Sequence, residues 1–258
     1  MDDPQIIPTM RMDFNDIQRS YHVPLEVLLS LFVEFYETLE LPMVHLAYTR
    51  SDVVLEGGAG IGFISGWLGK FARRVVSLEA IPEYAEIARA NLELNGIDNV
   101  TIISGALGVG RAETTFERRT IPYASSVLDG TWSHDEIQNT VTVPQYDINE
   151  LVREHGVNAL HLDLEGGEAL ILPAVDFTPI TKVIMEFHPR VIGVDACQEL
   201  LNLMMRNGLE AALVGGARNY PSHSYTAVFA REPFASKLRE GPFLGDTSPA
   251  KFERGART

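Results

Sequence analysis

Val53-Val54-Leu55-Glu56-Gly57-Gly58-Ala59-Gly60-Ile61-Gly62 is a short apolar run that ends in an acid and continues into glycines. The apolar part is typical of a buried parallel strand, and the run stops at Glu56. Gly58, Gly60 and Gly62 then occupy alternate positions. Glycine allows the backbone to turn sharply and lets a ligand approach without a Cβ in the way. The stretch therefore predicts a nucleotide-binding turn between a strand and a helix.

The spacing of these glycines distinguishes between two kinds of nucleotide ligand. A dinucleotide fingerprint requires G-x-G-x-x-G, and its third glycine would fall on Phe63 or Ser65 in this chain. The pattern found, E-x-G-x-G-x-G, resembles motif I of class I S-adenosylmethionine (SAM)-dependent methyltransferases. This resemblance implies that SAM is the cofactor. The residues that it places at SAM are Glu56, Gly58, Gly60 and Gly62.

A second apolar run, Arg74 to Ala80, ends in another acid, Glu79. Glu79 follows Glu56 by 23 residues, which is near the distance at which an acid meets the ribose hydroxyls of a bound nucleotide. We therefore expect Glu79 to bind the cofactor. The alternative is a generic α/β enzyme with glycines in a tight loop and a merely solvated Glu79.

Composition narrows the class of partner. A chain of 258 residues suits one α/β domain with appendages. The net charge of −14 and the pI near 4.9 argue against a nucleic-acid partner, because phosphate binding depends on clustered Lys and Arg. The single cysteine, Cys197, excludes an intrachain disulfide, and no signal peptide or long apolar run is seen. We expect a cytoplasmic protein without a membrane partner, and a homodimer is left open.

Alternating strand and helix patterns predict the fold class. They indicate a Rossmann-like, doubly wound, mostly parallel seven-stranded sheet with helices on both faces, the class I methyltransferase fold. The SAM-binding domain is expected over residues 46–232, with a hairpin or loop insertion at about 110–145. An arm and a cap helix, from Pro24 to a stop at Pro42, occupy residues 1–45. Residues 233–258 are expected to be an irregular tail.

The stretch His161-Leu162-Asp163-Leu164-Glu165-Gly166-Gly167-Glu168 is unusual for a strand of such a sheet. Strands of this kind are apolar on both faces, whereas polar groups alternate here. Buried carboxylates persist where something pairs with them or uses them. The next strand ends in an acid and a histidine, Glu186 and His188, before Pro189. We expect these titratable groups to converge on one pocket rim.

These residues also carry a specific family resemblance. D-x-E-G-x-E from Asp163 to Glu168, followed by the E-x-H-P that starts at Glu186, resembles the FkbM family of SAM-dependent methyltransferases, and the likeness runs from Val53 to Val214. Membership implies a Rossmann-like fold and, usually, O-methylation of hydroxyls on small molecules such as macrolides or sugars. Some members act on carboxylates or peptides. The further SAM contacts that it implies are Ala80, Ala106 and Asp163.

A hydroxyl acceptor needs its proton removed, and the candidates for the base are His188, Asp163 and then Glu165. Neighbouring acids should raise the pKa of His188 above about 6.5. Equally open are a role for His188 in ordering the loop before Pro189 and a SAM-contact role for Asp163. A carboxylate acceptor would need no base. A divalent metal on these residues is a lesser alternative, and we predict none, because the sulfonium already supplies positive charge.

The segment from Tyr123 to Gln138 concentrates aromatic and hydroxyl side chains outside the recurring units. Together with the helix from Pro24, it is expected to form the pocket for a small-molecule or peptide acceptor, because loops on a rigid scaffold commonly carry specificity. The alternative for that helix is that it simply covers the sheet. Two other classes remain open: a SAM-binding protein without catalysis, and an oxidoreductase, against which the missing third glycine argues.

Overall fold

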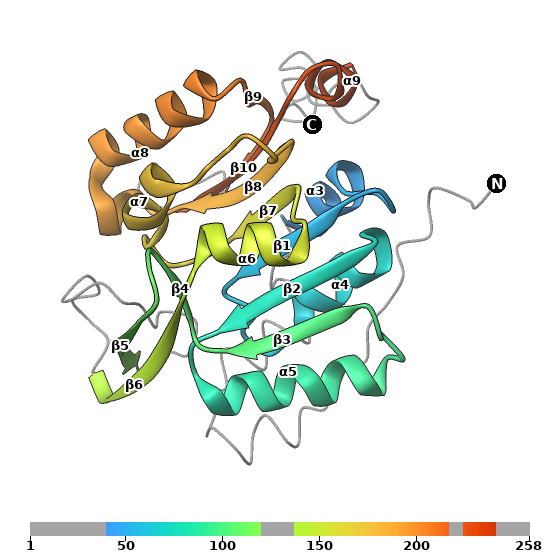
Figure 1. Ribbon diagram of the computed structural model, residues 1–258. Helices are drawn as coiled ribbons and strands as arrows, with labels where there is room; N and C mark the ends of the chain where they lie inside the picture. The colour runs from blue at the N-terminus through green and yellow to red at the C-terminus, as the bar shows by residue number, and fades with distance from the viewer. Residues whose placement is uncertain (1–39, 120–136, 217–223, 241–258) are drawn as a thin grey trace, which may run out of the picture.

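The computed structural model describes residues 40–119, 137–216 and 224–240, and these build one large sheet with helices on both faces (Figure 1). The strand order of this sheet is β3-β2-β1-β7-β8-β10-β9. The strands are β1 (Val53–Gly57), β2 (Arg74–Glu79), β3 (Val100–Ser104), β7 (Ala159–Leu162), β8 (Lys182–Phe187), β9 (Glu210–Gly216) and β10 (Tyr225–Ala230). The order reverses between β1 and β7, so a crevice opens at the carboxyl ends of these two strands.

Most neighbours in the sheet run parallel. β1 pairs in parallel with β2 and β7, while β2 pairs with β3 and β7 with β8 in the same sense. Only β10 is antiparallel, and it pairs with both β8 and β9. The predicted doubly wound, mostly parallel, seven-stranded sheet is therefore confirmed. The register aligns Leu162 of β7 with Met185 of β8, so the residues that follow these two strands emerge side by side.

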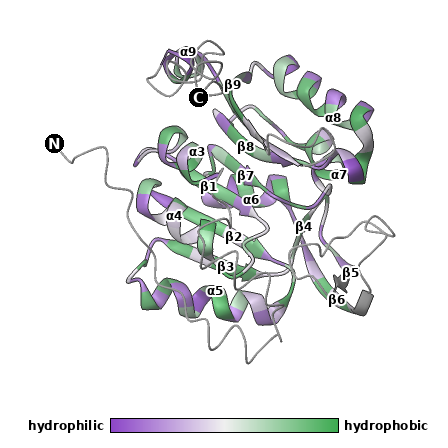
Figure 2. Ribbon diagram, turned by 180° about the vertical axis from the view of Figure 1, so that it is seen from behind, coloured by the Kyte–Doolittle hydropathy of each residue, from purple (hydrophilic) through white to green (hydrophobic). Residues whose placement is uncertain are grey.

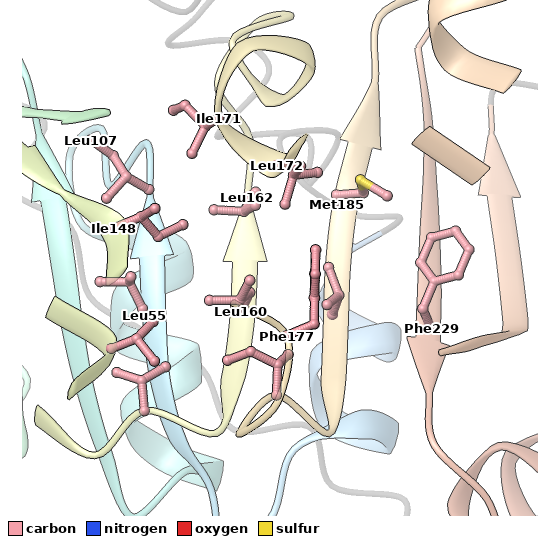
Figure 3. Close-up of a cluster of buried hydrophobic side chains, with 14 of the residues drawn as sticks. Leu55, Leu107, Ile148, Leu160, Leu162, Ile171, Leu172, Phe177, Met185 and Phe229 are labelled. Carbon is pink, nitrogen blue, oxygen red and sulfur yellow. The ribbon is translucent and has the colours of Figure 1, made fainter. Parts of the chain in front are cut away.

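Helices cover both faces of the sheet. They are α3 (Glu40–Ala47), α4 (Phe63–Phe71), α5 (Pro82–Leu94), α6 (Ile148–His155), α7 (Glu168–Ile171), α8 (Pro189–Arg206) and α9 (Phe234–Arg239). One apolar cluster joins the strands to α6, α7 and α8, and Figure 3 shows its side chains, including Leu55, Leu160 and Leu162. A second cluster joins the other face to α3, α4 and α9. Every residue of β1 is buried because helices cover both faces of the sheet, and this explains the apolar run Val53 to Leu55.

Side-chain periodicity accounts for the helices. α5 begins with a proline in its first turn, where no backbone N–H is needed, and buries one side only. Seen from behind, hydrophobic residues follow the central strands, whereas hydrophilic and hydrophobic residues alternate along α5 (Figure 2). α6 begins after Asp147, whose side chain accepts a hydrogen bond from the Glu150 amide, and it ends at Gly156 in the left-handed region.

A smaller sheet leaves the main one between β3 and α6. Its order is β4-β6-β5, with β4 (Ala106–Gly108), β5 (Ala112–Arg119) and β6 (Ile137–Asp147). β5 and β6 form an antiparallel pair in the region where the sequence indicates a hairpin or insertion. Most of the helix expected from Pro24 to Pro42, residues 24–39, and most of the expected acceptor loop, residues 123–136, lie outside the described residues.

Two details differ from the sequence-based expectations. Pro42 lies inside α3 rather than ending a helix, because a proline is tolerated in a first turn. The segment after Arg231, expected to be irregular, contains α9, which buries Ala235 and Leu238 against the second apolar cluster. In the part of the chain that the structure describes, no helix has the length and apolar character needed to span a membrane.

Candidate active site

The glycine turn after β1 is held tightly against its neighbours. Gly58 and Gly60 have positive φ angles of 92° and 53°, a region that L side chains rarely adopt. The amide of Gly58 donates to the Leu78 carbonyl at 3.1 Å. A Cβ on Gly58 would lie 2.0 Å from the carbonyl oxygen of Asp163, which shows how closely the turn approaches the end of β7. The glycines therefore serve both the turn and this contact.

Glu79, at the end of β2, is tied to the same turn. Its Oε2 accepts a hydrogen bond from the Gly60 amide at 2.7 Å, and its Oε1 accepts one from the Ile81 amide at 2.8 Å. Burial raises the pKa of Glu79 to about 7, although these two bonds favour the ionised form. Each oxygen of a carboxylate has two lone pairs, so Glu79 retains capacity to accept bonds from a ligand.

A small pocket, partly open to solvent, lies beside the turn. Its lining residues are Glu40, Glu56, Gly58, Ala59, Phe63, Ile64, His161 and Asp163. Glu56 Oε2 accepts a bond from Ser65 at 2.6 Å. By contrast, Glu56 Oε1 and Asp163 Oδ1 are buried without a hydrogen-bond partner among the described residues. Buried carboxylate oxygens of this kind call for a cationic or hydrogen-bonding ligand.

These features fit SAM. Its sulfonium and its amino group are both positively charged, and the pocket presents carboxylates from Glu40, Glu56 and Asp163. The turn leaves the backbone accessible where a nucleotide would approach. The structure thus brings the predicted Glu56, Gly58 and Asp163 together on one pocket wall. Gly60 and Glu79 stand next to it through their mutual hydrogen bond.

The other predicted cofactor residues lie farther along the same edge of the sheet. Gly62 precedes α4 with a φ of 83°, and a Cβ there would meet Ala88 of α5 at 2.9 Å, so its proximity to α5 already requires glycine. Ala80 and Ala106 are buried together with Val143 in a small apolar cluster after β2 and β3. The structure does not place these three residues on the pocket wall.

Sequence reasoning missed Glu40. This residue of α3 is 3% exposed, and its Oε2 lies 3.2 Å from Nε2 of His161, while Thr226 lies 3.3 Å from its Oε1. Burial lowers the pKa of His161, but Glu40 and then Glu56 raise it, and the net shift is upward. A single acid before the apolar stretch Leu41 to Ala47 was the only signal in the sequence. Glu40 and His161 therefore form a buried pair on the pocket wall.

Asp163, Glu165, Glu186 and His188 come together, as expected, at the ends of β7 and β8. His188 Nε2 lies 3.3 Å from Glu165 Oε2, 3.6 Å from Asp163 Oδ1 and 3.9 Å from Glu186 Oε2. These four residues are called the His188 cluster below. The predicted direction of the histidine pKa was wrong: burial lowers the pKa of His188 to about 4. The ring is neutral because the cost of burying its charge exceeds the attraction of its neighbours.

The pKa values of two acids in the cluster shift in the opposite direction, upward. Burial, reinforced by Asp163, raises the pKa of Glu186 to about 9, and burial raises the pKa of Asp163 well above its usual value. Glu165 has a φ of 51°, and it is the sole residue other than glycine with positive φ among the described residues. Such backbone strain persists where the surrounding structure enforces it, often at functional sites. Glu168 accepts a bond from the Leu164 amide at 2.6 Å and so orders this loop.

Comparison with known proteins agrees with this geometry. Residues 56–212, more than half of the chain, match the family described as the methyltransferase FkbM domain. The chain therefore belongs to the FkbM methyltransferase family. This is a family of SAM-dependent methyltransferases, and SAM is the cofactor that it implies here.

Matches to individual proteins are more limited. A protein-L-isoaspartate O-methyltransferase of Rhizobium meliloti is 34% identical over 94 residues, which are 35% of this chain and 46% of that protein. An uncharacterized RNA methyltransferase of Oceanobacillus iheyensis is 41% identical over 64 residues, 25% of this chain and 13% of that protein. The chain thus matches under half the length of these curated relatives.

Among solved structures, an uncharacterized protein from Listeria monocytogenes serotype 4b superposes with a TM-score of 0.47 at 13% identity, covering 84% of this chain and 81% of that chain. Precorrin-6y C5,15-methyltransferase from Geobacter metallireducens superposes with a TM-score of 0.45 at 15% identity, covering 76% and 88%.

Proposed function

We propose that this chain transfers the methyl group of SAM to a hydroxyl oxygen of a small molecule, such as a natural product, and that Asp163, Glu165 and His188 form the catalytic centre. The observation that carries the proposal is the meeting of these three titratable side chains beside the pocket that the glycine turn lines. SAM supplies the electrophilic methyl group when bound. What remains for the protein is to align the acceptor and to accept its proton.

Glu165 is best suited to accept that proton. Its strained backbone fixes it at the cluster, and its side chain is 15% exposed, whereas that of His188 is 5% exposed. During transfer the hydroxyl proton passes to a Glu165 oxygen and the acceptor oxygen bonds to the methyl carbon. The electron pair of the broken carbon–sulfur bond returns to sulfur. A positioned base of this kind contributes about 10²–10⁴-fold to the rate.

Asp163 and His188 position the reacting groups. Asp163 lies on the pocket wall, and its backbone carbonyl touches the glycine turn, so it links the cofactor side of the site to the cluster. His188 Nε2 lies within 3.9 Å of an oxygen of each of the three carboxylates, so it can hold them in one arrangement. We also propose that the stretch that starts at Pro24 and the segment from Tyr123 to Gln138 supply the acceptor pocket. Both lie outside the recurring strand–helix units of the sequence and concentrate aromatic and hydroxyl side chains.

Charge favours a hydroxyl acceptor over a carboxylate. An anionic acceptor would approach Glu40, Glu56 and Asp163 on the pocket wall together with the acids of the His188 cluster. Like charges at such short range repel one another in a partly buried site. Carboxylate methylation of a peptide or small acid, and SAM binding without catalysis, are the outcomes that would replace this proposal.

The test uses SAM with a deuterated methyl group. The purified chain is incubated with a set of hydroxyl compounds and with carboxylic acids of matched size, and mass spectrometry locates the label. A label that survives mild base on a hydroxyl compound is an ether and supports the proposal. A label released by mild base is an ester and contradicts it. The Gly60→Val variant, expected not to bind SAM, serves as the blank.

A further inference from the structure

The His188 cluster has the geometry of a cation site. Asp163, Glu186 and His188 each offer a ligand atom, and these atoms all lie within 4.8 Å of one another. The parallel register explains the arrangement, because Leu162 pairs with Met185 and the following residues, Asp163 and Glu186, emerge as neighbours. His188 lies two residues after Glu186, and its Nε2 points at both carboxylates.

Among the described residues, no lysine or arginine balances the acids of this cluster. Across residues 40–119, 137–216 and 224–240, no lysine or arginine lies within ion-pair distance of Asp163 or Glu186, and His188 is the one basic side chain that approaches them.

An unpartnered carboxylate oxygen lies in the cluster. Asp163 Oδ1 is buried without a hydrogen-bond partner among the described residues, and it lies 3.6 Å from His188 Nε2. His188 is 5% exposed, and its Nδ1 also lacks a partner in the described part of the chain. A buried ring nitrogen without a partner costs free energy, and Nε2 of this ring faces the carboxylates of the cluster. A metal ion bound at Nε2 would hold it.

We propose that Asp163, Glu186 and His188 bind one divalent cation. Two carboxylates and one imidazole suit a first-row ion such as Mn²⁺ better than Ca²⁺, which takes six to eight oxygen ligands. Three protein ligands leave coordination positions open for substrate or water. Glu165 is outside the ligand set and stays available as the proton acceptor.

The catalytic consequence rests on the proposed function. An acceptor hydroxyl oxygen bound at an open position of the cation would ionise more readily, since a Lewis acid stabilises the negative charge that forms on oxygen. The proton then passes to Glu165, and the methyl group passes from sulfur to oxygen as described above. The rival explanation is that the positively charged sulfonium of SAM balances the negative charge of the cluster without a metal ion.

The binding test uses the full chain, treated with chelator and dialysed, and titrated with Mn²⁺ by electron paramagnetic resonance with and without SAM. We expect one Mn²⁺ per chain in both conditions. Asp163→Asn and His188→Gln should each weaken binding by about 100-fold or more, since even residues behind metal ligands contribute about 10–100-fold. Glu93→Gln, an exposed acid on α5, is the control and should bind as the wild type does. Circular dichroism checks that each variant is folded.

Each result has a defined meaning. Absence of stoichiometric Mn²⁺ binding in the wild type, equal binding by the ligand variants, or displacement of Mn²⁺ by SAM overturns the cation site. Methyl transfer at the full rate by chelator-treated protein overturns its catalytic role. Mn²⁺ bound as expected, with labelled ester as the product, upholds the cation site and refutes the proposed hydroxyl acceptor, so the two failures can be told apart.

Discussion

The amide of Gly60 donates a 2.7 Å hydrogen bond to Oε2 of Glu79, and this bond joins the glycine turn after β1 to the end of β2. A turn with positive φ and a buried acid are thereby held in one arrangement before any ligand arrives. Preorganisation of this kind lowers the cost of ordering the site on binding. The first two predictions follow from this pair.

Replacing Gly60 by valine should abolish measurable SAM binding. A β-branched residue at a φ of 53° is strained and would force the turn open. Gly96→Val is the matched control, because Gly96 has a φ of 62° with open space around it at the end of α5. Both variants should lose similar stability, whereas only Gly60→Val should lose SAM affinity in calorimetry. Equal SAM affinity in the two variants would refute the assignment of the turn.

Binding of SAM should strengthen as pH rises through about 7. The pKa of Glu79 is about 7, and the ionised carboxylate is the better acceptor for ribose hydroxyls. Glu79→Gln should weaken binding by about 1.5–3 kcal/mol at alkaline pH, the range for bonds to charged groups, and should remove this pH dependence. Calorimetric titrations at several pH values measure both effects. A pH profile that is identical in the variant would argue that another group titrates.

Ionisation of Glu79, which should strengthen SAM binding, should weaken folding. Because the folded-state pKa of Glu79 is raised above its unfolded value, its contribution to stability is complete below that unfolded value. This contribution is lost as pH rises through about 7. Without SAM, the wild type should therefore lose stability relative to Glu79→Gln between about pH 5 and pH 8. Urea unfolding of both proteins at several pH values measures this difference.

His161→Gln should destabilise the protein more at acidic than at alkaline pH. Glu40 raises the pKa of His161 in the fold, so the pair contributes fully below the unfolded pKa of about 6.5 and fades above the folded pKa. The difference in unfolding free energy between wild type and variant, measured without SAM at about pH 6 and about pH 9, should shrink as pH rises. A difference that grew with pH would mean that His161 is buried as the neutral form.

Lys182→Met should cost about 3–5 kcal/mol, because it leaves the buried Asp52 without its partner at 2.7 Å. Asp52 also accepts bonds from Thr49, so it stays fixed in place. Combining Lys182→Met with Asp52→Asn should recover part of the loss. Arg206→Met, which breaks an exposed pair with Glu199, should change stability little. A Lys182→Met protein as stable as this control would contradict a structural role for the pair.

The sequence predicts those features of the fold that local residue patterns determine. Apolar runs, an acid and alternate glycines specify a strand, a turn and a helix within Val53 to Phe71, and the structure has all three. The mostly parallel pairing of the strands could be predicted because alternating strands and helices form a parallel sheet. The meeting of Asp163 with His188 could be anticipated because both follow strands at the same edge of the sheet.

The remainder depends on tertiary packing that no local pattern encodes. Glu40 reaches His161 across 121 residues, and Lys182 reaches Asp52 across 130. The pKa of His188 was misjudged because charged neighbours are visible in a sequence, whereas the depth of burial is not. Pro42 was taken as a stop because its place within the helix, which decides whether a proline is tolerated, appears only in the structure.

The central claim, that the His188 cluster is the catalytic centre, is tested most directly by the single-turnover rate of Glu165→Gln with the acceptor found by labelling. The account predicts a fall of about 10²-fold or more in the methyl-transfer step, with SAM affinity within a few-fold of wild type, while Glu93→Gln keeps the wild-type rate. A Glu165→Gln rate close to that of Glu93→Gln, with both proteins saturated with SAM, would contradict the account.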